Sequence, residues 1–149
     1  MGILNQAGKS PAVRFIKLDS AGQHLPADAA EWDAILDLTT NLTWSVRETR
    51  SMSQSKATAS VKKLTTCSFQ DWRLPTRAEL LTLVDDTRHS PAINTAFFPD
   101  CKSNWYWTST PAAYSPGDYA WFVDFDGGDA NWDFQDYSGF VRACRAGQS

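Results

Sequence analysis

Histidine, cysteine and long apolar runs are scarce in this chain of 149 residues. No apolar run approaches the roughly 20 residues that a membrane span requires, so we expect no membrane insertion. The only histidines, His24 and His89, lie in polar stretches, and the chain contains neither H-E-x-x-H nor G-x-S-x-G. The sequence offers no local catalytic motif, and we predict that the protein is not an enzyme.

The three cysteines are Cys67, Cys101 and Cys144. An odd number allows at most one disulfide within the chain, and the sequence leaves its pairing open. No two of them are close enough in sequence to form a typical zinc motif. Met1 to Ser10 contains no long apolar stretch, so no signal peptide is predicted. For a chain made in the cytoplasm, three reduced thiols are the simpler interpretation.

Charge and aromatic residues are unevenly distributed. The formal net charge is −3, which disfavours nucleic acid as a ligand. Residues 97–140 hold 14 of the 19 aromatic side chains, together with seven Asp and a single Lys. The last third of the chain is therefore both aromatic and acidic, and we expect it to carry the contact surface.

The residue pattern predicts an α+β fold with two helices and a small, mostly antiparallel, loop-rich sheet. Asp126–Asp129 (DGGD) is typical of a hairpin turn. On the strand before it, alternation places Trp121, Val123 and Phe125 on one face, and we expect one face to be core. The expected helices are Ser55–Leu64 and one beginning at Arg77; the expected strands are Val13–Leu18, Trp32–Asp37 (at an edge), Asn41–Arg47 (half-buried), Trp105–Thr108, Tyr119–Phe125, Ala130–Phe134 and Gly139–Cys144.

The strongest local signal is the segment DWRLPTRAELLTLV at 71–84. Pro75 disfavours helix in the residue before it. Thr76 and Glu79 have the T-x-x-E spacing of a capping box, in which side chains and backbone amides satisfy each other at a helix start. The helix should therefore begin at Arg77.

Several blocks in order resemble a known family. They are FIKLD at 15–19, DLTTNLTW at 37–44, DWRLPT at 71–76 with Glu79 and Leu80, PAIN at 91–94 through Phe98–Pro99, WYWTS at 105–109, YAW at 119–121, VDF at 123–125, and Val141–Arg142. This ordered set resembles the C-terminal domain of the Legionella collagen-like adhesin, over about residues 13–147. The WRLPT–EL block is also shared with formylglycine-generating-enzyme-like proteins.

The resemblance implies a C-type-lectin-like fold, as one domain over 13–149 after an N-terminal arm of residues 1–12. It implies recognition by a loop-rich half of the domain; members include adhesins, phage-associated proteins and the diversified proteins of retroelements. Two departures stand out. The second cysteine that members often carry upstream of Cys67 is absent. The naming adhesin resembles a binder of sulfated polysaccharides, which the acidic last third of this chain would repel.

Rings with polar handles bind sugar faces and protein surfaces at modest entropic cost. The positions after the DGGD turn mix such rings with polar groups, and those before it can join them. We therefore expect ligand binding by Asn131, Trp132, Asp133, Phe134, Gln135, Asp136 and Tyr137, with Tyr114, Ser115, Asp118 and Tyr119 from the preceding loop. Core packing is the alternative explanation for the aromatic residues.

Asp124, Asp126 and Asp129 surround two glycines, which is a pattern compatible with calcium, a cation that takes about six to eight oxygen ligands. A bidentate Glu at EF-hand spacing is absent, and a solvated hairpin tip is the alternative. We therefore expect no obligatory cofactor, with calcium as the candidate metal.

The remaining motif residues are expected to be structural. Arg73 and Arg142 should anchor the core by pairing with an Asp. The resemblance adds framework roles for Trp107, Trp121 and Phe125. The full structural set is Trp72, Arg73, Pro75, Thr76, Glu79, Trp107, Trp121 and Arg142.

The leading hypothesis is a non-catalytic recognition domain that binds a cell-surface glycan or protein, as a phage receptor-binding or diversified protein. Such a protein would be made in the cytoplasm and displayed on a particle or exported by another route, as a homotrimer or within a larger virion assembly. The alternatives are a structural virion protein whose aromatic surface packs on partner chains, and an enzyme of the formylglycine-generating type.

Overall fold

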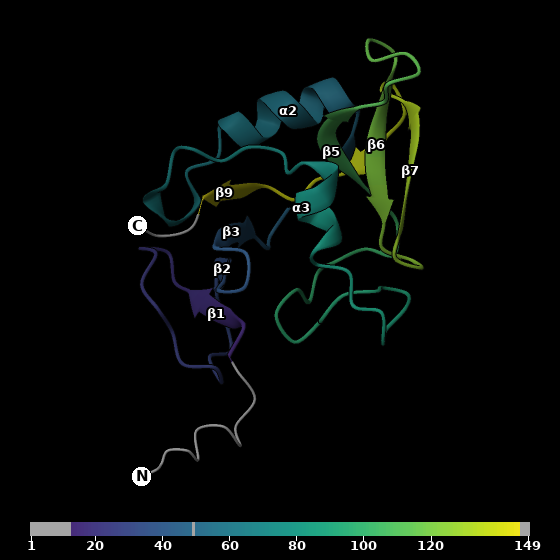
Figure 1. Ribbon diagram of the computed structural model, residues 1–149. Helices are drawn as coiled ribbons and strands as arrows, with labels where there is room; N and C mark the ends of the chain where they lie inside the picture. The colour runs from purple at the N-terminus through teal and green to yellow at the C-terminus, as the bar shows by residue number, and fades with distance from the viewer. Residues whose placement is uncertain (1–12, 49, 147–149) are drawn as a thin grey trace.

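The computed structural model describes residues 13–48 and 50–146; the expected N-terminal arm, residues 1–12, lies outside them. A first sheet has the order β1 (Phe15–Leu18), β2 (Ala34–Asp37), β3 (Leu42–Ser45) and β9 (Cys144–Ala146), with every pair antiparallel. It therefore joins the beginning of the described chain to its end (Figure 1). The strand expected within 32–37 is β2, and it lies inside the sheet and not at an edge, because it has a partner on each side.

The β3 strand is buried along its whole length, although alternation predicted one solvated face. Trp44 packs into the core on one side. On the other side, Ser45 Oγ accepts a hydrogen bond from the Ala143 amide at 2.9 Å. The segment leading into β9 thus covers the polar face that was expected to meet water.

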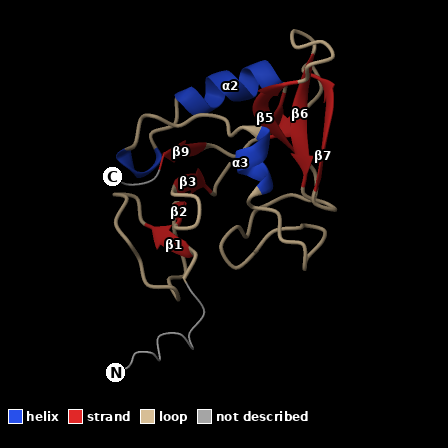
Figure 2. Cartoon of the chain, in the orientation of Figure 1, coloured by secondary structure: helices blue, strands red, loops and turns tan. Residues whose placement is uncertain are grey.

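A second sheet has the order β4 (Ser51–Met52), β8 (Gly139–Phe140), β5 (Trp105–Pro111), β6 (Tyr119–Asp124) and β7 (Asp129–Phe134). Its pairs are antiparallel except for a short parallel contact between β5 and β8. Figure 2 shows β5, β6 and β7 as the long strands of this sheet, and β7 forms its edge.

The predicted strand Gly139–Cys144 is in fact two short strands. Gly139–Phe140 belongs to the second sheet, and Cys144–Ala146 belongs to the first. The chain crosses between the sheets at Val141, Arg142 and Ala143, which are all buried. The sequence pattern of 139–144 does not reveal this change of sheet, because the residues before and after the crossing are buried alike.

Two helices lie between β4 and β5 along the chain. Helix α2 (Gln54–Lys62) is capped by the Ser53 side chain, buries Ala57 and Val61, and corresponds to the helix expected over Ser55–Leu64. A short 3-10 turn, η1 (Thr66–Ser68), follows. Helix α3 (Arg77–Leu81) begins where the capping box predicted.

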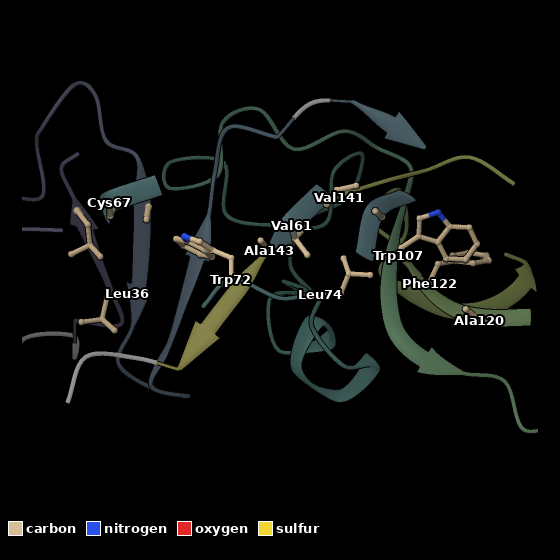
Figure 3. Packing of buried hydrophobic residues seen from close by; sticks show 13 residues of the cluster. Leu36, Val61, Cys67, Trp72, Leu74, Trp107, Ala120, Phe122, Val141 and Ala143 are labelled. Carbon is tan, nitrogen blue, oxygen red and sulfur yellow. The ribbon is translucent and has the colours of Figure 1, made fainter. Parts of the chain in front are cut away.

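Both faces of β6 contribute buried residues to the core, whereas the sequence predicted one buried face. Phe122 joins a cluster with Trp107 and Val61, and Figure 3 shows that cluster reaching from Leu36, in β2 of the first sheet, to the second sheet. Val123 and Phe125 belong to another cluster, which contains Leu80 of α3 and Trp44 of β3. The second sheet is therefore covered on both faces over much of its length.

Candidate ligand-binding surface

Five aromatic rings form a continuous line along the β6–β7 hairpin, here called the aromatic ridge: Tyr114, Tyr119, Trp132, Phe134 and Tyr137. Tyr114, Phe134 and Tyr137 are exposed, and Tyr119 and Trp132 are half-buried. Successive ring centroids lie 5.7 Å (Tyr114–Trp132), 5.0 Å (Trp132–Tyr119), 4.5 Å (Tyr119–Phe134) and 5.5 Å (Phe134–Tyr137) apart. Tyr114 is 78% exposed, Phe134 43% and Tyr137 49%. All five were predicted ligand residues, and the fold brings them together.

Strand geometry explains the ridge. Tyr119 of β6 lies opposite Phe134 of β7, and Trp121 lies opposite Trp132. Because side chains alternate between the faces of a strand, these four rings share one face of the sheet. Tyr114 joins them from the β5–β6 loop, and Tyr137 from the segment after β7.

The ridge is exposed because α3 covers only part of that sheet face. Trp121 marks the boundary: it is half-buried beneath Arg77 of α3, whose guanidinium carbon lies 4.0 Å from the ring centroid. Leu80 of the same helix is fully buried. Sequence reasoning missed Arg77, because nothing local relates it to a tryptophan 44 positions away.

Gln135 fixes the loop that supports the ridge. Its side-chain amide donates to the carbonyl oxygens of Pro116 and Tyr119, each at 3.1 Å. Its own carbonyl accepts from the Gln54 amide at 2.9 Å, which ties the hairpin to the start of α2. These contacts give Gln135 a supporting position among the predicted ligand residues.

The predicted acidic and amide residues divide into two groups. Asp118 and Asp136 are exposed in the segments that also carry Tyr114, Tyr119 and Tyr137, and Asp118 Oδ2 accepts from the Ser115 hydroxyl at 2.8 Å. By alternation, Asn131 and Asp133 point away from the face that carries Trp132. Asp118 and Asp136 are thus direct sequence neighbours of the ridge residues Tyr119 and Tyr137, whereas Asn131 and Asp133 lie on the opposite face.

Carboxylate oxygens of the acidic turn accept hydrogen bonds from groups of the protein itself. Asp124 Oδ1 accepts from the Asp126 amide at 2.9 Å, and Asp126 Oδ1 accepts from the Ser90 hydroxyl at 2.9 Å. Gly128 has φ +89°, and a Cβ there would lie 2.8 Å from a Val84 methyl, so glycine is required. Within residues 13–48 and 50–146, no group of three His, Cys, Asp or Glu side chains is placed to hold a metal ion. Calcium binding at Asp124, Asp126 and Asp129 stays a prediction.

The WRLPT segment is a rigid support. Arg73 forms two parallel hydrogen bonds with Glu79, at 2.8 and 2.9 Å, which corrects the expectation of an Asp partner. Thr76 and Glu79 complete the capping box. The Arg73 guanidinium holds the pKa of Glu79 below its ordinary value. The Pro75 carbonyl accepts from the Ser109 amide at 2.8 Å, which attaches this segment to β5.

The other expected structural residues differ in their surroundings. Trp72 and Trp107 are buried and donate their indole N–H groups to the carbonyls of Thr66 and Met52. Arg142 is 2% exposed and donates to the Ser45 carbonyl at 2.6 Å. Its guanidinium lies over Phe98 and Tyr106, so aromatic faces surround this cation where an Asp partner was expected.

The histidines and cysteines do not converge on the ridge. His24 and His89 are exposed, and His89 Nδ1 lies 3.4 Å from the Ser90 hydroxyl. All three cysteines are buried and free. Burial raises the pKa of Cys67 to about 11 and that of Cys144 to about 12, so both are thiols at neutral pH.

An open cleft of about 600 Å³ lies between β1 and the segment after α3. Phe15, Leu83, Val84 and Phe97 supply apolar side chains to it, and Asp86 is an acidic lining residue. Sequence reasoning missed this cleft, because its two walls come from distant parts of the chain and neither has a distinctive motif.

No helix in the described ranges is long and apolar enough to cross a bilayer. A comparison with curated protein sequences gives no match. A comparison with protein-family models matches residues 33–145 to the Lcl C-terminal domain. The matched region includes the capping box, both long hairpin strands and the whole aromatic ridge, and it confirms the resemblance drawn from the sequence motifs. The chain therefore belongs to the Lcl C-terminal domain family, a family of adhesin-like domains.

Proposed function

We propose that this chain is a non-catalytic recognition domain whose aromatic ridge binds a cell-surface glycan or protein. The observation that carries the proposal is the continuity of five rings on a surface held by rigid strands. An exposed apolar surface of this kind is typical of an interaction site, and Tyr and Trp dominate the binding energy of many interfaces. The adhesin-like family agrees with a binding role.

The two-sheet, loop-rich arrangement supports a C-type-lectin-like fold within this proposal. Family context supports display on a phage particle or export as a diversified binding protein, as a homotrimer or a larger virion assembly. The same ridge favours a second candidate function, in which partner chains of a virion cover the rings.

The test is binding of the labelled protein to a glycan array and to whole bacterial cells. Tyr114→Ala and the double variant Trp132→Ala/Tyr137→Ala remove rings from the ridge. Leu38→Ala is the matched control, because Leu38 is 51% exposed and lies on the turn between β2 and β3. We expect the ridge variants to lose binding and the control to keep it, with unchanged circular dichroism.

Two further arms separate the alternatives. Repeating the array with calcium and then with a chelator tests the acidic turn at Asp124, Asp126 and Asp129, because calcium-dependent binding would assign the metal a role. Sedimentation analysis tests the assembly function. The recognition function would be contradicted if the protein bound neither the array nor the cells. Concentration-dependent association that the ridge variants abolish would then favour packing against partner chains.

A further inference from the structure

The surroundings of the aromatic ridge lack positive charge. No Lys or Arg occurs between Lys102 and Arg142, the interval that contains all five rings. Asp118 and Asp136 are exposed carboxylates in the two segments that carry the ends of the ridge. Ring faces are negative by their quadrupole, so rings and carboxylates favour the same sign of charge in a ligand.

The same sheet face already holds one cation of its own. The Arg77 guanidinium lies over the Trp121 ring at 4.0 Å from its centroid, and Trp121 is the cross-strand partner of Trp132 in the ridge. None of the ion pairs found in the described part of the chain involves Arg77. A guanidinium is therefore accommodated on this face by an aromatic ring without a carboxylate partner.

We infer that the aromatic ridge binds arginine side chains presented by a partner protein. The inference rests on the proposed recognition function and narrows its ligand class. Arginine fits better than a compact ammonium, because its planar, weakly hydrated guanidinium stacks on rings while its N–H groups reach carboxylates such as Asp118 and Asp136. The successive rings, spaced 4.5 to 5.7 Å apart, offer several such faces in a line.

Charge complementarity decides against the other ligand classes. A sulfated or phosphorylated polymer would be repelled by the carboxylates beside the rings. A neutral sugar would stack on the rings and could donate hydroxyl hydrogen bonds to Asp118 and Asp136, but it carries no positive charge to balance theirs. An amino sugar shares the positive charge but lacks the planar group that Arg77 places on Trp121.

The test is calorimetric titration of the full chain with end-capped peptides of six identical residues. Hexa-arginine is compared with hexalysine and with hexacitrulline, which is planar like arginine but neutral. A glucosamine hexamer and an N-acetylglucosamine hexamer represent charged and neutral glycans. We expect hexa-arginine to bind about tenfold more tightly than hexacitrulline, a factor within the range of cation–π and ion-pair energies, and more tightly than hexalysine.

Variants assign the binding to the ridge. Tyr114→Ala removes its most exposed ring, and Asp118→Asn/Asp136→Asn removes two charges. Asp28→Asn/Asp100→Asn is the control, because it makes the same charge change at exposed positions outside residues 103–141. We expect both ridge variants to weaken hexa-arginine binding about fivefold, and the control to change it less than twofold.

Three results would overturn the inference: equal affinity for hexacitrulline and hexa-arginine, equal losses in the ridge and control variants, or no binding of hexa-arginine. Tighter binding of the glucosamine hexamer than of hexa-arginine would reject the protein partner in favour of an amino sugar. If the ridge variants still lose binding to cells or to a neutral glycan, the recognition function stands and only the arginine ligand falls. If neither the cells, the glycan array nor the peptides and hexamers show binding that the ridge variants weaken, both the recognition function and the arginine ligand are rejected.

Discussion

Gly139 and Trp107 are in direct contact at the centre of the second sheet. A Cβ on Gly139 would lie 2.8 Å from the Trp107 indole nitrogen, which donates a hydrogen bond to the Met52 carbonyl at 2.9 Å. Trp107 is fully buried, so the ring has no free space into which it can move. A residue with no side chain is therefore required beside this tryptophan.

We expect Gly139→Ala to destabilise the protein by about 1–3 kcal/mol, the usual cost of overpacking a core. Gly117→Ala is the matched control, because a Cβ at Gly117 meets no atom within 4 Å. Urea unfolding followed by tryptophan fluorescence measures both variants. Equal unfolding free energies for the two alanine variants would contradict this contact.

At the scale of elements, helix α3 depends on the charge of Glu79. This carboxylate accepts from Arg73 and from the Thr76 amide, and hydrogen bonds from Arg73 are the main reason that its pKa lies below the ordinary 4.5. The folded-state pKa is thus lower than that of the unfolded chain. The interaction therefore stabilises the fold above about pH 4.5, and this stabilisation is lost as the pH falls through the folded-state pKa.

We expect the unfolding free energy of the wild type to fall more steeply below pH 4.5 than that of Glu79→Gln. Glutamine keeps the capping-box geometry but carries no titrating charge. Asp28→Asn, at an exposed position, should keep the wild-type slope. Parallel pH slopes for wild type and Glu79→Gln in urea unfolding would show that the pair contributes nothing.

The outward-facing backbone amides of the edge strand β7 are hydrogen-bonded by side chains of the same strand. The backbone amide of Gln135 donates to the backbone carbonyl of Asp118 across the hairpin. Because backbone amides along a strand alternate in direction, those of Trp132 and Phe134 point away from β6. These two amides donate to Asn131 Oδ1 and Asp133 Oδ1, each at 2.8 Å. Exposed edge donors are a template for pairing with another chain, so these side chains protect the edge.

We expect Asn131→Ala/Asp133→Ala to increase concentration-dependent self-association, measured by sedimentation velocity. Asn104→Ala is the control, since Asn104 Oδ1 makes the same contact with the Trp105 amide on β5, which lies inside the sheet. If both variants sediment as the wild type does, then the side chains do not protect the edge.

At the scale of the whole molecule, the fold is held by two packed clusters and not by covalent links. Cys67, Cys101 and Cys144 are all buried and free. Burial is the main cause of the raised pKa of Cys67 and Cys144, and it leaves very little reactive thiolate near neutral pH.

We therefore expect the melting temperature to be the same with and without a reducing agent. Ellman's reagent should react slowly with the native protein and should titrate three thiols after unfolding in urea. Fast reaction of one thiol in the native state, or a lower melting temperature in the reducing agent, would contradict buried and unpaired cysteines.

The sequence by itself determined the features that depend on near neighbours. The start of α3 was predictable because Thr76 and Glu79 are three residues apart and cap the same turn. The DGGD turn was predictable because a positive φ at Gly128 has a local chemical signature. The five ridge rings were also identified, because strand alternation and adjacent loops place residues 114–137 close together.

Only the tertiary structure decided which elements meet across long separations. Ser45 and Ala143 are 98 residues apart, yet their contact turns a half-exposed strand into core. Contacts between distant parts of the chain also explain three other features. They are the division of 139–144 between two sheets, the burial of residues on both faces of β6, and the position of Arg77 over Trp121. Such contacts depend on how surfaces from distant parts of the chain pack together, and a local residue pattern does not indicate which distant segment will pack against it.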